Sequence, residues 1–299
     1  MKILYLIDQV YLHGGIEKVL SQKANYLSDK LGFEVIIVTS NQNDNLPCYN
    51  FSNKIRFLDL GINYIQGKSY FHPQNIYKQF LHFKKLKKII IEKNPDIIIS
   101  SSYTPDTFFI PFICNKIPKI KEYHVTKFFN NDKKIKTKLI NTMFSFINSK
   151  YDKVVILNED EKKYYNNENT ETIPNPTEID EEKCNLNTKK IIAAGRITDQ
   201  KNFEHFVYIW KKIPQEFKDW EVHIYGENFH KNKENIEKLI LENNLENNIF
   251  FKGTVSNLKL VFLDYSIFAM TSKYETFPMV LLEALSVGLP IVSYNCPTG

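Results

Sequence analysis

Residues 275–285 read ETFPMVLLEAL, and they lie between two short apolar segments at residues 267–270 and 290–294. The two segments have the length of buried strands, whereas residues 279–287 form an apolar run long enough for a helix. Pro278 suits the first turn of that helix, because its missing N–H would have no partner there. A strand, a helix and a strand in this order predict a βαβ unit and therefore a parallel sheet.

The same alternation extends over the rest of the chain. We predict strands at residues 2–7, 34–39, 55–59, 96–100, 117–124, 153–157, 189–194, 220–225 and 249–251, and helices at residues 15–31, 74–93, 133–148, 202–213 and 233–243. Residues 258–263 form a further segment of the pattern. This pattern is typical of an α/β protein. Pro174 and Pro176 interrupt it and are followed by residues 178–182, of which four are acidic. We therefore expect one domain over residues 1–172 and a second over residues 173–299.

The composition excludes several classes of protein. Charged residues make up 24% of the chain and hydrophobic residues 43%, which excludes a wholly disordered chain. The four cysteines form no Cys-x-x-Cys pair, which argues against a zinc site or a disulfide framework and favours the reducing cytoplasm. The longest apolar runs are too short to cross a membrane.

The net charge of +5 is concentrated in residues 1–172. This basic half indicates an anionic lipid or another phosphate-rich partner, although solvated lysines explain it equally well. The basic runs at residues 84–88 and 133–139 fit an amphipathic helix on an anionic membrane, or a helix packed on its own sheet. Neither run has the interleaved aromatic residues that would indicate nucleic-acid binding.

Two glutamates stand out in the region around the last predicted helix. Glu275 precedes the helix, and Glu283 lies eight residues later among apolar neighbours. A buried carboxylate needs a cation or hydroxyl groups as partners, and two adjacent sugar hydroxyls would supply them. The free N–H groups of the first helical turn, around residues 277–280, favour an anion.

A second group of polar residues follows the predicted strand at residues 189–194. Gly195 ends the strand, and Arg196 and Lys201 lie in the loop that leads into the next helix. A guanidinium fork, an ammonium and backbone donors are the groups that bind a diphosphate. The loop therefore predicts a diphosphate site.

Two weaker signals lie in the first half of the chain. Gly14 and Gly15 follow the first strand and would let the backbone approach a ligand closely. His124 lies at the carboxyl end of the strand predicted at residues 117–124, and His13 is the only other histidine that we consider. No Gly-x-Gly-x-x-Gly pattern is present, which argues against an NAD-binding domain.

These motifs, taken in order, resemble those of family 4 glycosyltransferases. Glu275 and Glu283 match the E-x7-E signature of that family, Arg196 and Lys201 its diphosphate loop, Gly14 and Gly15 its Gly-Gly-x-Glu loop, and His124 its strand-end histidine. The resemblance implies the GT-B fold, in which two Rossmann-like domains face a cleft. The chain would lack the end of its second domain, which would lower its stability or activity.

The resemblance also implies a retaining hexosyltransferase that uses a nucleotide-diphosphate sugar, with UDP expected rather than GDP. The catalytic residues would be Arg196, Lys201, His124 and Glu275. Glu283 would bind the ribose. The other donor-binding positions would be Gly195, Thr276, Phe277, Met279, Val280, Gly226 and Val255. Gly14 and Gly15 would lie on the acceptor side. Nothing resembles an Asp-x-Asp metal site, so we expect no metal and no other cofactor.

The last residues of the chain resemble those of enzymes that build bacterial capsules and exopolysaccharides. This implies a glycan or polyprenyl-diphosphate-linked acceptor, in the cytoplasm or at the inner face of its membrane. Three alternatives stay open: a glycosyltransferase with a small acceptor, a non-catalytic subunit that binds nucleotide sugars, and a nucleotide-sugar epimerase. An epimerase would not account for both the diphosphate loop and the E-x7-E pair.

Overall fold

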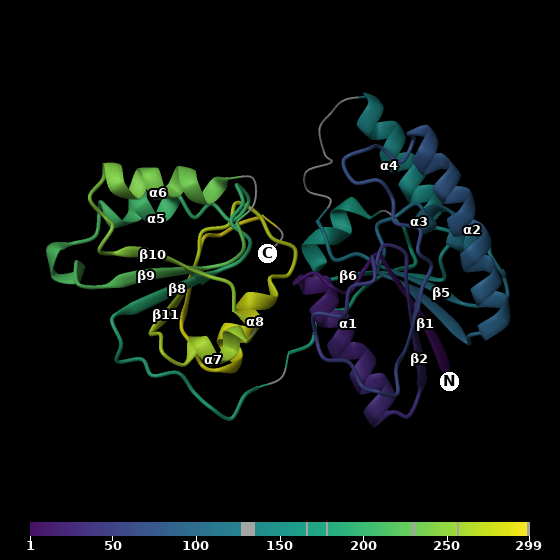
Figure 1. Ribbon diagram of the computed structural model, residues 1–299, viewed down its shortest axis with the longest axis horizontal. Helices are drawn as coiled ribbons and strands as arrows, with labels where there is room; N and C mark the ends of the chain where they lie inside the picture. Colours follow the sequence, from purple (N-terminus) through teal and green to yellow (C-terminus); the bar gives the residue numbers. More distant parts are fainter. Residues whose placement is uncertain (127–134, 166, 178, 229–230, 256, 298–299) are drawn as a thin grey trace. The chain divides into compact units, whose positions relative to one another are not determined.

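A computed structural model describes residues 1–126, 135–165, 167–177, 179–228, 231–255 and 257–297. For residues 135–139 it describes the backbone and not the side chains. The chain divides into two compact units, Met1–Pro176 and Thr177–Gly299 (Figure 1). The sequence places the boundary four residues earlier, directly after the last strand of the first unit. Each unit is an α/β fold with one parallel sheet, as the alternating pattern predicts.

The first unit has a seven-stranded sheet in the order β3-β2-β1-β4-β5-β6-β7. Its strands are β1 (Lys2–Ile7), β2 (Glu34–Thr39), β3 (Arg56–Asp59), β4 (Ile97–Ser100), β5 (Lys119–Glu122), β6 (Lys153–Ile156) and β7 (Thr170–Thr172). Its helices are α1 (Gly15–Asn25), α2 (Pro73–Lys93), α3 (Asp106–Phe109) and α4 (Ile135–Asn148), with the short turns η1 (Tyr26–Lys30), η2 (Ile110–Phe112) and η4 (Glu159–Tyr164). The strand order reverses between β1 and β4, and ligands of such sheets bind beyond the carboxyl ends of the strands at this switch point.

Alternate residues of β1 enter two separate hydrophobic cores. Leu4 and Leu6 of β1 pack with Leu86 and Ile90 of α2 on one face of the sheet. Ile3 and Tyr5 of the same strand pack with Leu20 of α1 on the other face. Because side chains alternate along a strand, an apolar run such as KILYLI fills both cores at once.

The second unit repeats the arrangement with five strands in the order β10-β9-β8-β11-β12. Its strands are β8 (Lys190–Ala194), β9 (Glu221–Tyr225), β10 (Ile249–Gly253), β11 (Ile267–Met270) and β12 (Ile291–Ser293). Its helices are α5 (His205–Trp210), α6 (Asn232–Glu242), α7 (Leu258–Phe262) and α8 (Met279–Ser286), with the short turn η5 (Gln215–Phe217). The switch point lies between β8 and β11.

Helices cover both faces of this second sheet. Phe206 of α5 and Ile236 of α6 pack on one face, and Phe262 of α7 and Ala284 of α8 pack on the other (Figure 1). The prediction of a helix over residues 202–213 is wrong at both ends, because α5 begins at His205 and ends at Trp210. Asn202 has φ 56°, a left-handed conformation that an α-helix does not contain.

None of the helices in the described part of the chain is both long enough and apolar enough to span a bilayer.

Candidate active site

The switch point of the second unit brings together two of the residues that the sequence singled out. Lys201, in the loop after β8, donates a hydrogen bond from its ammonium to Glu275 Oε1 at 2.5 Å, in the loop after β11. The side chains of both residues are largely buried. A buried pair of opposite charges places one cation and one carboxylate at the carboxyl edge of the sheet, where a ligand would meet them.

Backbone and amide hydrogen bonds fix these two loops to each other. The Lys273 N–H donates to the Gln200 carbonyl at 2.8 Å, and the Gln200 amide donates to the Tyr274 carbonyl at 2.9 Å. The Thr271 hydroxyl donates to the Lys201 carbonyl at 2.9 Å, and the Asn202 amide donates to the Thr271 carbonyl at 3.2 Å. The position of Lys201 is therefore set by both strands of the switch point.

Glycines allow the loops after β8 and β9 to touch. A Cβ atom on Gly226 would lie 1.8 Å from the Gly195 carbonyl oxygen, so no other residue fits there without moving backbone. A Cβ atom on Gly195, which has φ 149°, would lie 2.9 Å from Lys201 Cε. Close packing of backbone therefore requires glycine at position 226, whereas a Cβ atom at position 195 would meet only the flexible side chain of Lys201.

Glu283 lies inside α8, in the helix that the apolar run at residues 279–287 predicts. It is buried, at 7% exposure, although it carries a carboxyl group in an apolar helix. The helix begins at Met279, so Thr276 and Phe277 precede it, and Val280 lies in its first turn. Val255 follows β10 and is exposed. These residues share the carboxyl edge because the loops after parallel strands all lie there.

Arg196 is exposed in the loop after β8. It is one of only two arginines in a chain whose other cationic side chains are mostly lysine, and the second is Arg56 on β3. Arginine is the side chain that binds phosphate oxygens through two parallel hydrogen bonds. Its place beside the Lys201 loop fits the diphosphate site that the sequence predicts.

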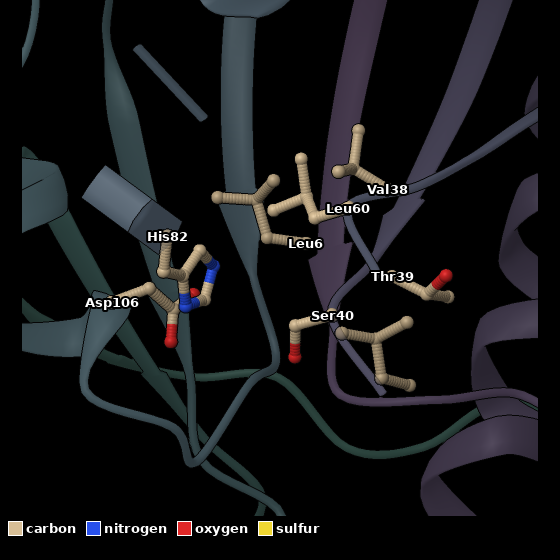
Figure 2. A pocket seen from close by; sticks show the side chains of 8 residues that line it. Leu6, Val38, Thr39, Ser40, Leu60, His82 and Asp106 are labelled. Atoms are coloured by element: carbon tan, nitrogen blue, oxygen red, sulfur yellow. The ribbon is translucent and has the colours of Figure 1, made fainter. Parts of the chain in front are cut away.

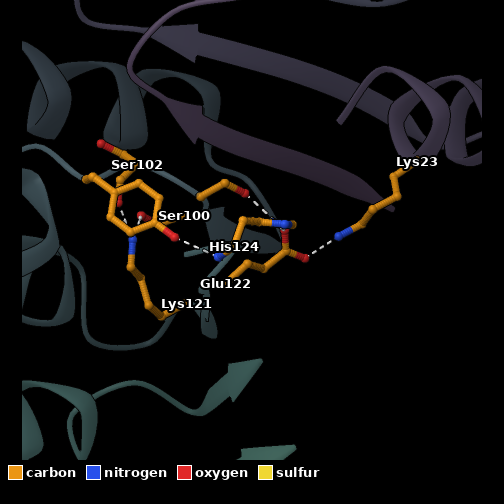
Figure 3. A network of polar contacts seen from close by, with 8 residues as sticks. Lys23, Ser100, Ser102, Lys121, Glu122 and His124 are labelled. Carbon is orange, nitrogen blue, oxygen red and sulfur yellow. Dashed lines mark hydrogen bonds and ion pairs between the residues drawn. The ribbon is translucent and has the colours of Figure 1, made fainter. Parts of the chain in front are cut away.

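The first unit places His124 two residues beyond β5, in a set of polar contacts that Figure 3 shows. Its Nε2 lies 3.4 Å from Glu122 Oε2, and its backbone N–H donates to the Tyr103 hydroxyl at 2.6 Å. Its side chain is 6% exposed, and its Nδ1 has no hydrogen-bond partner among the described residues. The ring is therefore held beside Glu122, and its Nδ1 is a buried polar atom without a partner among the described residues.

Glu122 was not identified from the sequence, and it holds this cluster together. Its carboxylate accepts hydrogen bonds from the Lys23 ammonium of α1 and from the Ser101 hydroxyl at 2.9 Å. Burial raises the pKa of Glu122, but the Lys23 charge and the His124 ring outweigh burial and lower that pKa to about 2. Glu122 is therefore a buried carboxylate that stays ionised because of its partners.

A second buried charge, Lys121, lies on the neighbouring position of β5. Its ammonium donates to the Ser102 carbonyl and lies 5.2 Å from the ring centroids of Tyr103 and Tyr123. Burial lowers the pKa of Lys121 to about 8, opposed by the carboxylate of Asp106. A strand that reads KIKE between apolar segments was the only signal of these charges in the sequence.

The ends of β1 and β4 are joined at the switch point of the first unit. Asp8 follows β1 and accepts a hydrogen bond from the Ser102 hydroxyl at 2.6 Å, and the same hydroxyl oxygen lies 2.8 Å from Asp106 Oδ1. Burial raises the pKa of Asp8. A small cavity with room for about one water molecule opens beside this network. Its polar lining includes Ser40 and His82 (Figure 2).

Gly14 and Gly15 lie at the start of α1, as predicted. Gly14 is the residue before the helix, and a Cβ atom on it would lie 2.2 Å from the buried carboxylate of Glu17. Glu17 accepts a hydrogen bond from the Gln9 amide at 2.5 Å. His13, the other histidine considered, is exposed beside this loop.

The basic run at residues 133–139 lies partly outside the described residues. Residues 133 and 134 are not described, and the side chains of 135–139 are not described either. The run at residues 84–88 is on α2 and is fully described.

Family models match both halves of the chain. The model described as Glycosyltransferase Family 4 matches residues 13–181, which is more than half of the chain. This chain belongs to glycosyltransferase family 4. The model described as Glycosyl transferases group 1 matches residues 175–299 of the same glycosyltransferase. The expectation of this family from the E-x7-E pair and the diphosphate loop is confirmed.

Individual relatives agree with this assignment. The family 4 chain is 25% identical to an uncharacterized glycosyltransferase of Haemophilus influenzae, over 100% of this chain and 82% of the relative. It is also 25% identical to the amylovoran biosynthesis glycosyltransferase AmsD of Erwinia amylovora, with the same two shares.

Solved structures confirm the fold. The structure of S. aureus TarM in complex with UDP, α-GlcNAc-glycerol and fondaparinux superposes with a TM-score of 0.77 at 16% identity, over 100% of this chain and 86% of TarM. The expected GT-B fold, with two parallel-sheet domains of which the second is smaller, is therefore confirmed.

Proposed function

We propose that this GT-B glycosyltransferase moves a hexosyl group from a nucleotide-diphosphate sugar to a hydroxyl of its acceptor, with retention at the anomeric carbon. The observation that carries the proposal is the set of hydrogen bonds that join the loops after β8 and β11 at the switch point of the second unit. There Lys201 is held within 2.5 Å of Glu275, and Arg196 lies in the same loop. Two cations of different shape in one loop suit a diphosphate better than a single phosphate.

The proposed chemistry is electrostatic. As the bond from the anomeric carbon to the diphosphate breaks, negative charge grows on the leaving oxygen. Arg196 and Lys201 stabilise that charge, and the hydrogen bond of Lys201 to Glu275 supports the proposal because it positions one of the two cations before the reaction. No carboxylate is assigned as a covalent nucleophile, so we propose a displacement on one face of the sugar in which the leaving diphosphate takes the proton of the acceptor hydroxyl. These cations take the place that a metal ion has in other transferases.

The remaining residues receive separate roles. Glu283, a buried carboxylate, binds the two ribose hydroxyls. Glu275 binds the donor sugar, and the Lys201 ammonium contacts both Glu275 and the diphosphate. The backbone near Gly195, Gly226 and Val255, together with residues 276–280, holds the nucleotide. In the first unit we propose that His124 contacts the transferred sugar and that the Gly14–Gly15 loop lies on the acceptor side.

For the donor we propose UDP rather than GDP, because the TarM structure that superposes on this chain contains UDP. For the acceptor we propose a glycan or a polyprenyl-diphosphate-linked oligosaccharide in surface polysaccharide synthesis, since AmsD is an amylovoran biosynthesis enzyme. The protein would then act in the cytoplasm, at the inner face of the membrane.

The test is transfer from a panel of UDP- and GDP-sugars to membrane extract, followed by NMR of the product. We expect one donor to be used, an unchanged anomeric configuration, and no loss of rate with a chelator. Arg196→Ala should lower kcat/KM by about 100- to 1,000-fold, which is the usual effect of removing one group that stabilises the transition state.

Arg56→Ala is the matched control, because Arg56 is the other arginine and its side chain is 69% exposed on β3. Equal losses in the two variants would contradict the assignment of Arg196. Donor binding without turnover on any acceptor would favour a non-catalytic subunit that binds nucleotide sugars, and turnover only on small acceptors would overturn the lipid-linked acceptor.

A further inference from the structure

Glu122 faces the Nε2 side of the His124 ring, and both oxygens of its carboxylate accept hydrogen bonds from other groups. Oε1 accepts from the Lys23 ammonium, which reaches it from α1. Oε2 accepts from the Ser101 hydroxyl at 2.9 Å and lies 3.4 Å from His124 Nε2 (Figure 3). The side chains of Glu122 and His124 are 8% and 6% exposed, so water screens this contact only weakly.

The charge of the Glu122 carboxylate decides which ring nitrogen of His124 carries a hydrogen. An ionised carboxylate only accepts hydrogen bonds, and Lys23 supplies the opposite charge that keeps Glu122 ionised. The nitrogen that faces the carboxylate must therefore be a donor. In a neutral imidazole one nitrogen is a donor and the other an acceptor, so a hydrogen on Nε2 leaves a lone pair on Nδ1.

The backbone of His124 is anchored separately from its ring. Its N–H donates to the hydroxyl of Tyr103, in the loop after β4, at 2.6 Å. The Lys121 ammonium lies 5.2 Å from the centroid of the Tyr103 ring, a cation–π contact that holds the ring in place. An imidazole that is fixed at its backbone and at one ring nitrogen has little freedom to turn over and exchange its two nitrogens.

Nδ1 is the ring nitrogen that this arrangement leaves for another partner. It is buried and has no hydrogen-bond partner among the described residues. A buried polar atom without a partner costs free energy, and most such atoms in proteins are paired. His124 follows β5 at the carboxyl edge of the sheet, one strand from the switch point between β1 and β4. Ligands of such sheets bind at this edge, so a ligand atom there would pair Nδ1.

We propose that Glu122 is a positioning residue, which holds His124 in the tautomer with the hydrogen on Nε2 and so presents the Nδ1 lone pair to a hydroxyl group of the bound sugar. A lone pair accepts a hydroxyl hydrogen, whereas it repels an ionised phosphate oxygen, which is itself only an acceptor. His124 then selects a sugar that has a hydroxyl at one position. The inference rests on the proposed function, in which His124 contacts the transferred sugar, but the tautomer can be measured without any transfer.

The tautomer is measured by long-range ¹H–¹⁵N NMR of the full chain labelled with ¹⁵N-histidine, at about pH 8, where an unperturbed histidine is neutral. His124→Gln identifies the signals of His124 among the seven histidines. We expect the wild-type ring to carry its hydrogen on Nε2. Glu122→Gln should give a mixture of both tautomers, because an amide group both donates and accepts. A wild-type ring with the hydrogen on Nδ1, or on both nitrogens, would overturn the proposal whether or not the variants fold.

The second unit supplies a matched control. Glu221 and His223 also lie two residues apart on one strand, β9, and Glu221 Oε2 lies 2.8 Å from His223 Nε2. Glu221→Gln should change the signals of His223 and leave both the His124 signals and the transfer rate unchanged. If Glu221→Gln altered the His124 signals as much as Glu122→Gln does, the effect would be a general one and the proposal would be wrong.

Kinetics of transfer separate a positioning role from a structural one. Glu122→Gln should lower kcat/KM about 10- to 100-fold, the usual effect of removing a carboxylate that orients a functional histidine. Glu122→Asp should lose less, because it keeps the charge. Glutamine matches the size of glutamate more closely than aspartate does, so a purely structural role would give the opposite order.

Monodeoxy analogues of the donor sugar test the hydroxyl contact directly. The wild type should use one of them about 10-fold less well than the parent sugar, because the analogue leaves Nδ1 unpaired. Glu122→Gln should reduce that difference. Equal use of every analogue by the wild type would show that no hydroxyl meets Nδ1.

The inference and the proposed function can fail separately. If the wild-type ring carries its hydrogen on Nε2 and Glu122→Gln loses this preference, but no donor is turned over, the proposed reaction and the hydroxyl contact are wrong and the positioning by Glu122 stands. If a donor is turned over while the wild-type hydrogen is on Nδ1, the reaction stands and the inference is wrong.

Discussion

Replacing Lys23 by methionine should destabilise the first unit, because it leaves the Glu122 carboxylate buried without its main cationic partner. The side chain of Glu122 is 8% exposed, and Lys23 reaches it from α1. Methionine keeps the apolar stem of lysine and removes only the charge. The variant therefore isolates the ion pair from the packing of α1 on the sheet.

The magnitude follows from the pKa of Glu122, which is lowered from 4.5 to about 2. That shift corresponds to about 3 kcal/mol of stability at neutral pH. Part of it comes from His124, so we expect Lys23→Met to lower the free energy of unfolding by about 2 kcal/mol. Adding Glu122→Gln should recover part of the loss, because the double variant no longer buries an unpaired charge.

The assay is urea unfolding at pH 7 followed by far-UV circular dichroism. Both tryptophans, Trp210 and Trp220, lie in the second unit, so tryptophan fluorescence reports that unit separately. Lys238→Met is the control, because its side chain is 77% exposed and its ion pair with Glu242 is 3.7 Å long. A Lys23→Met midpoint no lower than that of Lys238→Met would refute the reasoning, as would a double variant no more stable than the single one.

Three further predictions concern the same two sheets. Because the folded-state pKa of Glu122 lies below its unfolded value, its contribution to stability is complete above about pH 4.5 and should be lost as the pH falls toward 2, measured as the urea midpoint against pH. Because the folded-state pKa of Lys121 is lowered from 10.5 to about 8, the unfolded chain binds more protons between these values. Wild-type stability should gain up to about 3 kcal/mol from this group as the pH rises from 8 to 10.5, and Lys121→Met should show no such gain. Gly226→Ala would place a Cβ 1.8 Å from the Gly195 carbonyl oxygen. It should lower the free energy of unfolding, measured by tryptophan fluorescence, by about 2 kcal/mol. Gly253→Ala should lower it less, because its Cβ would meet open space, despite its φ of 74°.

The local sequence was sufficient to predict the strands and helices that contain long apolar runs. The strand KILYLI and the helix around Leu86 and Ile90 form where the pattern predicts them, because their side chains must fill a core. The start of α5 was missed because Asn202 takes a left-handed conformation and donates its amide to Thr271, almost seventy residues away in the chain. No local pattern contains that contact.

Some residues of the candidate site were predicted from sequence motifs, and others became apparent only in the structure. Lys201 and Glu275 were identified from motifs, and the structure adds that they bond to each other. Glu122 was missed because its partners come from three different elements: Lys23 on α1, Ser101 after β4, and His124 after its own strand. Charged residues inside a short strand were the available signal, and only the assembled sheet shows which of them are paired.

The hydrogen bonds between the loops after β8 and β11 have a consequence for how a ligand would be received. The cost in conformational entropy of holding Lys201 in place is met once, when the second unit folds, and not again at each binding event. A ligand that uses this lysine therefore meets a surface that is already arranged.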